Sequence, residues 1–236
     1  MGYQTLTVAA VIAAMTTGSM AQIGNTGTLR YSQRVSNTGG GAFHWMSGTV
    51  GNGFGDFKSF CLERDESIGP NRDFYGIIND EAVRGGVNTD LGDPISNATK
   101  AVYLGFLNGI NDSSVNAALN ALSNDAERNG AFQLAIWNLE QEFEGDAPGT
   151  FNTPGDGDYD GEAAVSHAAA NALLAWAATQ TQYDQALLDN VFVVNIYRNA
   201  DLSGWAQDML IYIPLPQTGA LAGLGLAGVA IRRRRA

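Results

Sequence analysis

The spacing of apolar residues changes twice along this chain, and that change limits the fold more than any other feature. Residues 24–60 hold short runs of alternating apolar and polar side chains between Gly-, Ser- and Thr-rich turns, which is typical of β-strands. Residues 96–144 have helical spacing, and 191–213 alternate again. This order predicts an α+β fold with a strand-rich part, barrel-like or sandwich-like, and an inserted helical subdomain. The predicted strands are 28–32, 42–46, 191–197 and 209–213.

Four helices are expected between the two strand-rich parts. The apolar positions indicate helices near 98–106 and 115–122, and a third that starts near Asp125. A Gly-, Asp- and Pro-rich linker, 145–161, separates these from an Ala-rich helix over 162–179. We therefore expect one folded domain, residues 22–213, between two terminal segments that serve other purposes.

The first terminal segment, residues 1–21, carries no charged side chain. Its apolar run, 6–15, is followed by the small residues at 19–21 that a signal peptidase recognises. The alternative is a buried helix of the domain, but such a helix normally has a polar face and this run has none. We interpret residues 1–21 as a cleavable signal peptide, which predicts an exported protein.

The second terminal segment, residues 214–236, contains a proline motif, a short apolar run and a basic tail. At about 1.5 Å per residue, the apolar run 218–231 is short for a hydrocarbon core, so we expect a transient transmembrane helix. The basic tail would stop transfer and remain on the cytoplasmic side of the membrane. The motif is Pro214, Leu215, Pro216, Gln217, Thr218 and Gly219, and the tail is Arg232, Arg233, Arg234 and Arg235.

This C-terminal segment resembles the PEP-CTERM sorting signal, in the variant with Pro-Leu-Pro, which implies processing by an exosortase. Residues 215–219 also spell the LPXTG motif, which implies a sortase that cuts after Thr218. We favour the exosortase interpretation because the apolar run is short and leads directly into arginines. Either transpeptidase would place the protein in the cell envelope, at the cell surface.

The charge balance narrows the range of partners. Loss of the four tail arginines takes the net charge from −11 to −15. Nucleic acid and anionic membrane surfaces are poor partners for such a chain, because like charges repel. We expect membrane contact only through the C-terminal segment.

The only cysteine, Cys61, excludes an internal disulfide. A lone thiol in an exported chain is either a buried, inert side chain or a reactive group. Cys61 lies within Ser59–Glu63, and the predicted helix carries Gln133 within Ala131–Trp137.

These two motifs resemble the Cys-Gln thioester domains of bacterial surface adhesins, over roughly residues 57–213. The resemblance implies a thioester-domain-like fold and a covalent bond between the Cys61 sulfur and the Gln133 side-chain carbonyl. Phe60, Ile136 and Trp137 would pack in the core and shield that bond. The sequence departs from the family at Phe132, where a threonine is expected.

The chemistry requires a proton acceptor as well as the two reacting residues. The Cys61 thiolate would attack the Gln133 carboxamide and expel ammonia, and the product would react with a lysine amine or a sugar hydroxyl. Candidate proton acceptors, by proximity in the sequence, are Glu63, Asp65 and Glu140, but a solvated surface carboxylate is the favoured interpretation of each.

Two other groups of residues are candidate sites. Asp156, Asp158 and Asp160 match the first half of a calcium loop, and the alternative is a solvated acidic linker. No other cofactor is expected. A hydrolase with a Cys61–His167 pair is the least favoured hypothesis.

The sequence thus predicts an adhesion or binding protein rather than an enzyme. Its partner would be an extracellular matrix, polysaccharide or protein surface, reached through the thioester. The alternatives are a non-reactive structural component of the envelope or extracellular matrix that carries a sorting signal, and a sortase substrate with the same domain.

Overall fold

The computed structural model describes the following parts of the chain: residues 23–46, 48–50, 56–64, 68–70, 72–83, 92–142, 165–179 and 185–213. The predicted signal peptide, calcium loop, sorting motif and arginine tail lie outside these residues, as does the predicted C-terminal transmembrane helix. Among the residues that are described, no helix has both the length and the apolar character needed to cross a membrane.

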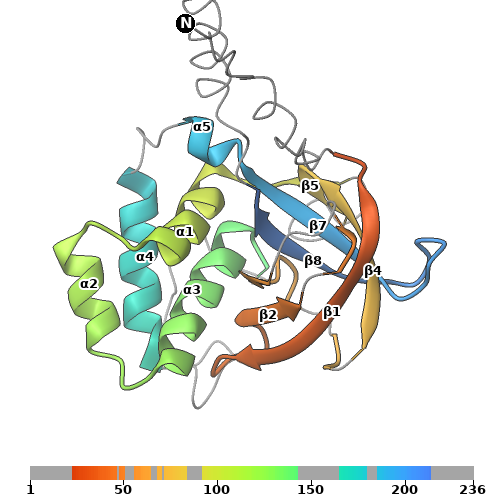
Figure 1. The fold of residues 1–236 in the computed structure, drawn as a ribbon. Helices are drawn as coiled ribbons and strands as arrows, with labels where there is room; N and C mark the ends of the chain where they lie inside the picture. The colour runs from red at the N-terminus through yellow and green to blue at the C-terminus, as the bar shows by residue number, and fades with distance from the viewer. Residues whose placement is uncertain are drawn as a thin grey trace, which may run out of the picture.

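Six strands form an antiparallel sheet in the order β3-β2-β1-β4-β7-β8 (Figure 1). A second, two-stranded sheet pairs β5 with β6. The strand bounds are β1 Thr26–Val35, β2 Ala42–Met46, β3 Phe57–Ser59, β4 Asp73–Asn79, β5 Glu81–Ala82, β6 Asp93–Pro94, β7 Val191–Tyr197 and β8 Trp205–Tyr212.

The residues after β3 join the two edges of the large sheet. Phe60 O accepts a hydrogen bond from Leu210 N at 3.1 Å, and Leu62 N donates to Asp208 O at 2.9 Å. Cys61 lies between them and forms a β-bridge with Met209 of β8. Because β3 pairs with β2 and its continuation pairs with β8, the sheet closes into a barrel. The predicted α+β class is confirmed, and Cys61 lies in the barrel wall.

In the sequence, the helices lie between β6 and β7, and in the fold they pack together on one side of the barrel (Figure 1). Three of them have side-chain N-caps, from Ser96, Asp112 and Asn124, which accept hydrogen bonds from the first turn. This insertion is the helical subdomain that the sequence predicts. The bounds are α1 Asn97–Asn108, α2 Ser113–Asn120, α3 Asp125–Leu139, α4 His167–Thr179 and α5 Gln185–Leu188.

Helix α3 lies at the centre of the molecule. It packs against α1 and α4 on one side and against β1 and β2 on the other. Every residue from Gly130 to Asn138 is therefore buried, polar side chains included. A helix that is covered all round carries its polar side chains into the interior, and here these include Gln133 and Asn138.

Candidate functional site

The structure brings together the two residues that the sequence singles out. The Cys61 thiol donates a hydrogen bond to Oε1 of Gln133 at 3.4 Å. The Gln133 side-chain amide donates in turn to the Cys61 backbone carbonyl at 2.9 Å. Cys61 is 2% exposed and Gln133 is 0% exposed, so the pair is closed off from solvent.

Two backbone N–H groups also point at the Gln133 carbonyl oxygen. Gly41 N donates to Oε1 at 2.8 Å and Cys61 N donates to it at 3.1 Å. Two such donors on one carbonyl oxygen form an oxyanion hole, which stabilises the negative charge of a tetrahedral intermediate. The donors polarise the carbonyl beside the Cys61 sulfur, so attack of the sulfur on the amide carbon is the reaction that this geometry favours.

The turn between β1 and β2 lies directly on the Cys61–Gln133 pair. A Cβ atom on Gly40 would stand 2.7 Å from Gln133 Oε1, 2.8 Å from Cys61 Sγ and 2.6 Å from Trp137 Cζ2. Gly41 has φ +123°, a conformation that side chains rarely adopt. Neither glycine was predicted as a site residue, and the run of three glycines, Gly39–Gly41, is the sequence signal that points to them.

Hydrogen bonds hold this turn against α3. Asn37 N donates to Ala126 O at 3.2 Å, and Asn129 Nδ2 donates to Val35 O at 2.8 Å. Within the turn, the Thr38 hydroxyl donates to Gly40 O at 2.9 Å. The helix that carries Gln133 therefore also positions the N–H group that contacts the Gln133 carbonyl.

The three residues predicted to shield the site, Phe60, Ile136 and Trp137, are all buried. The Trp137 ring lies against Gly40, which also contacts Cys61 and Gln133. Phe60 packs edge-on against Phe106, with ring centroids 4.7 Å apart. Phe132, which stands where a threonine was expected, joins this aromatic cluster, so it is the two backbone N–H groups that orient the Gln133 carbonyl.

The environment of the thiol keeps it protonated. Burial raises the pKa of Cys61 well above its ordinary value, and the nearby Glu63 charge raises it further. The backbone N–H groups of Gly41 and Cys61, and the charge of Arg34, act in the opposite direction but more weakly. A thiol in this state needs a proton acceptor before it can attack.

Of the three candidate proton acceptors, the structure describes two, and both are buried rather than solvated surface carboxylates as the sequence favoured. Glu63 is buried beside Asp208, whose backbone N–H donates to Glu63 Oε2 at 2.8 Å. Glu140 lies at the N-terminus of α1, where Ser96 N donates to it at 3.5 Å. Asp65 lies outside the described residues. Glu63 is the one whose charge acts on Cys61.

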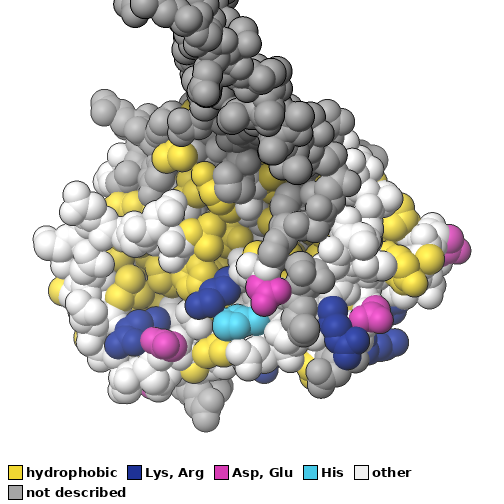
Figure 2. Space-filling model, in the orientation of Figure 1, with side chains coloured by type: hydrophobic (Ala, Val, Ile, Leu, Met, Phe, Trp, Pro, Cys, Tyr) yellow, Lys and Arg dark blue, Asp and Glu magenta, His cyan; other side chains and the backbone are white. Residues whose placement is uncertain are grey.

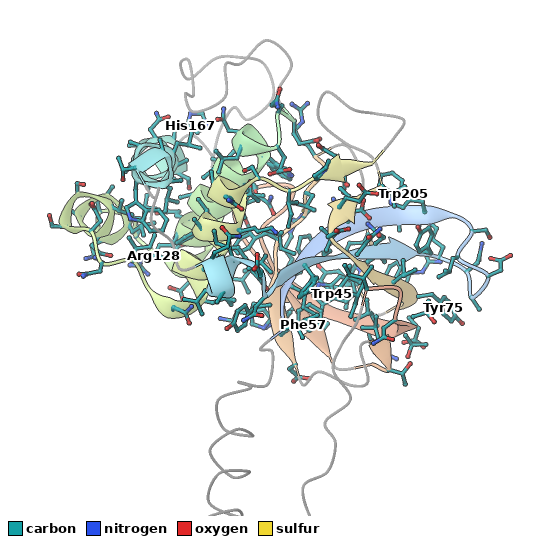
Figure 3. All side chains as sticks on the ribbon, turned by 90° about the horizontal axis from the view of Figure 1, so that it is seen from above. Trp45, Phe57, Tyr75, Arg128, His167 and Trp205 are labelled. Carbon is teal, nitrogen blue, oxygen red and sulfur yellow. The ribbon has the colours of Figure 1, made fainter. Side chains whose placement is uncertain are left out.

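The histidines take other positions. His167 begins α4 on the helical side of the molecule, away from the Trp45 and Phe57 pair of β2 and β3 (Figure 3). His44 lies in β2, where its Nδ1 is 3.2 Å from Gln33 Nε2. The Cys61 thiol donates to Gln133, so the pairing with His167 that a cysteine hydrolase needs gains no support. Within the described ranges, no three His, Cys, Asp or Glu side chains are arranged to hold a metal ion.

Charged side chains on the surface are mixed in sign. Arg128 contacts Asp125 at 2.8 Å, and Arg30 contacts Asp73 at 3.3 Å. On the face drawn in Figure 2, Lys and Arg side chains have acidic side chains beside them. This face therefore offers mixed charge rather than the basic stripe that a nucleic acid would require.

Comparison with protein families finds one match, at the C-terminus. Residues 213–235 match the PEP-CTERM protein-sorting motif. The chain carries an exosortase sorting signal. The motif implies that the protein is exported and anchored in the cell envelope, and it supports the exosortase interpretation over the sortase one. Comparison with curated proteins and with solved structures gave no match.

Glu140 makes the stability of the domain depend on pH. Burial raises the pKa of Glu140 to about 7, although the Thr99 hydroxyl, which donates to its carboxylate, acts in the opposite direction. The folded state therefore holds this proton at a pH where the unfolded chain, with the ordinary value of 4.5, has lost it.

We expect the contribution of Glu140 to the free energy of unfolding to be largest below pH 4.5. This contribution should be lost as pH rises through about 7. The loss attributable to this side chain is about 3 kcal/mol. Urea unfolding at a series of pH values measures it, and Glu140→Gln should flatten the curve. If the free energy of unfolding changed with pH equally in the wild-type protein and in Glu140→Gln, this role of Glu140 would be contradicted.

Proposed function

We propose that this exported protein is a surface adhesion or binding protein that attaches covalently to its partner through a thioester between Cys61 and Gln133. One observation carries the proposal: the buried Gln133 Oε1 accepts hydrogen bonds from Gly41 N–H, Cys61 N–H and the Cys61 thiol together. A glutamine that only filled the core would not need an oxyanion hole beside a thiol.

Thioester formation uses only groups of this chain. The Cys61 sulfur attacks the Gln133 side-chain carbon, and the charge that develops on Oε1 is held by the N–H groups of Gly41 and Cys61. The carbon–nitrogen bond then breaks, and the thiol proton leaves with the nitrogen as ammonia. A carbon–sulfur bond replaces a carbon–nitrogen bond, and no other reactant is consumed.

The thioester would then react once with a partner. An amine or hydroxyl of an extracellular matrix, polysaccharide or protein surface attacks the same carbonyl, the Cys61 thiol is released, and the partner remains bonded to Gln133. Burial of the pair keeps water from the bond until that nucleophile arrives. Because the reactive group is consumed, the protein acts as a covalent binder rather than as an enzyme.

The intact mass of the purified protein tests this proposal. The expected mass is lower than the mature sequence by one ammonia, and methylamine treatment should replace that loss with one methylamine adduct. Cys61→Ala should keep its ammonia and take up no methylamine, because no sulfur is present to form the bond.

An unmodified mass, together with one thiol that reacts after unfolding, would refute the thioester. The protein would then be a non-reactive structural component of the envelope, delivered there by its sorting signal.

A further inference from the structure

Glu63 is held beside the Cys61–Gln133 pair by β8. It follows Cys61 by two residues, and Leu62 between them donates to Asp208 O in the closing pair of the barrel. Glu63 O accepts a hydrogen bond from Gln207 Nε2 at 2.6 Å, and Glu63 Oε2 accepts one from Asp208 N at 2.8 Å. Cys61 forms its β-bridge with Met209, and Glu63 Oε2 accepts from the N–H of the preceding residue, Asp208, so the two residues lie over adjacent positions of β8. The Glu63 charge acts on the Cys61 thiol, and one water can carry a proton between two such groups.

The Glu63 carboxyl group lacks a hydrogen-bond partner at one of its two oxygens. Its residue is 3% exposed, and its Oε1 has no hydrogen-bond partner. Asp208, which lies against it, is 0% exposed but is supplied with donors from Val83 N and Trp205 Nε1. Two buried carboxyl groups in contact share one proton, and the group with fewer donors holds it. Glu63 is that group.

We infer that Glu63 is the proton acceptor for Cys61 during thioester formation, and that its pairing with Asp208 sets the pH at which the bond forms. This inference rests on the proposed function. Within the part of the chain that the structure describes, the Glu63 Oε1 atom is the one buried carboxylate oxygen without a hydrogen-bond donor, and this inference assigns it a role two residues from the thiol.

The proton returns to the departing nitrogen, so the step balances. The Glu63 carboxylate takes the proton from the Cys61 sulfur, and the sulfur bonds to the Gln133 carbonyl carbon. When the carbon–nitrogen bond breaks, protonated Glu63 gives the proton to the nitrogen, which leaves as ammonia. Glu63 ends in its starting state.

The charges around Glu63 determine the direction of the pH effect. Burial raises the pKa of Glu63 well above its ordinary value, and the Asp208 charge raises it further. Glu142, after α3, acts in the same direction, while Arg34 of β1 faces the thiol. The reactive carboxylate form of Glu63 therefore appears only as pH rises through this raised pKa, so thioester formation should accelerate with pH over that range.

Refolding of the full chain from denaturant tests the inference, with loss of ammonia followed by intact mass in buffers from mildly acidic to mildly alkaline. Glu63→Gln should slow the reaction about a hundredfold and remove the pH step. Its amide oxygen can still accept from Asp208 N, so the fold is retained. The matched control is Glu127→Gln, the same change at a glutamate in the first turn of α3, which should keep the wild-type rate.

A second variant, Asp208→Asn, removes the charge that keeps Glu63 protonated. It should move the pH step to lower pH, which a purely structural role for the pair would not produce. Glu63→Gln that forms the thioester at the wild-type rate, with the wild-type pH profile, would overturn the inference and leave the proposed function intact. Wild-type protein that loses no ammonia at any pH would overturn both.

Discussion

Replacement of Gly40 by alanine is expected to abolish thioester formation. The added Cβ would stand 2.7 Å from Gln133 Oε1 and 2.8 Å from Cys61 Sγ, both closer than van der Waals contact allows. The turn must then move away from α3 and take the Gly41 N–H with it. Loss of one oxyanion donor alone slows acyl transfer by about a hundredfold to a thousandfold. Intact mass measures the result, because the variant should keep its ammonia.

Gly39→Ala is the matched control for this prediction. Gly39 precedes Gly40 in the same turn, but a Cβ on it would meet no atom within 4 Å. This variant should lose ammonia as the wild-type protein does. A Gly40→Ala protein that forms the thioester as fast as Gly39→Ala would show that close contact by the turn is not required.

The second large effect is expected from Phe60→Ala. Phe60 is 0% exposed, and its ring contacts Tyr103, Phe106 and Phe132, with centroids 6.4, 4.7 and 6.3 Å away. Removal of a fully buried phenylalanine ring costs about 4 kcal/mol, because apolar contacts are lost and a cavity remains. Urea unfolding should show this decrease in the free energy of unfolding.

The site should also be affected, because Phe60 precedes Cys61 in the barrel wall. Any thioester in Phe60→Ala should hydrolyse faster than in the wild-type protein, which timed mass spectra would measure. Phe57→Ala is the control: Phe57 begins β3, three residues before Phe60, is partly buried and stacks on Trp45 with ring centroids 6.3 Å apart. It should cost clearly less stability, and an equal loss would contradict the central position given to Phe60.

Most elements were predictable from local patterns, but one important strand was not. The strands around 28–32 and 191–197, and the helix that carries Gln133, follow from apolar spacing and β-branched content. The central strand β4, Asp73–Asn79, was missed because Gly76 interrupts its pattern. That glycine is needed because the side chains of Leu29 in β1 and Val194 in β7, the two neighbouring strands, would stand 2.8 Å from a Cβ atom on Gly76. This close contact arises from the packing of the sheet and is not visible in the sequence of β4 alone.

The sequence by itself determined that the protein carries an exosortase sorting signal, and it singled out Cys61 and Gln133 as the candidate pair. The sorting motif is a short, contiguous signal, and Cys61 and Gln133 stand in local motifs whose residue types the chemistry requires. Only the tertiary structure decided what surrounds that pair. The Gly41 N–H comes from a turn 92 residues before Gln133, and Asp208 meets Glu63 across 145 residues. Barrel closure brings these groups together, and no local pattern encodes a contact made by two distant backbone segments.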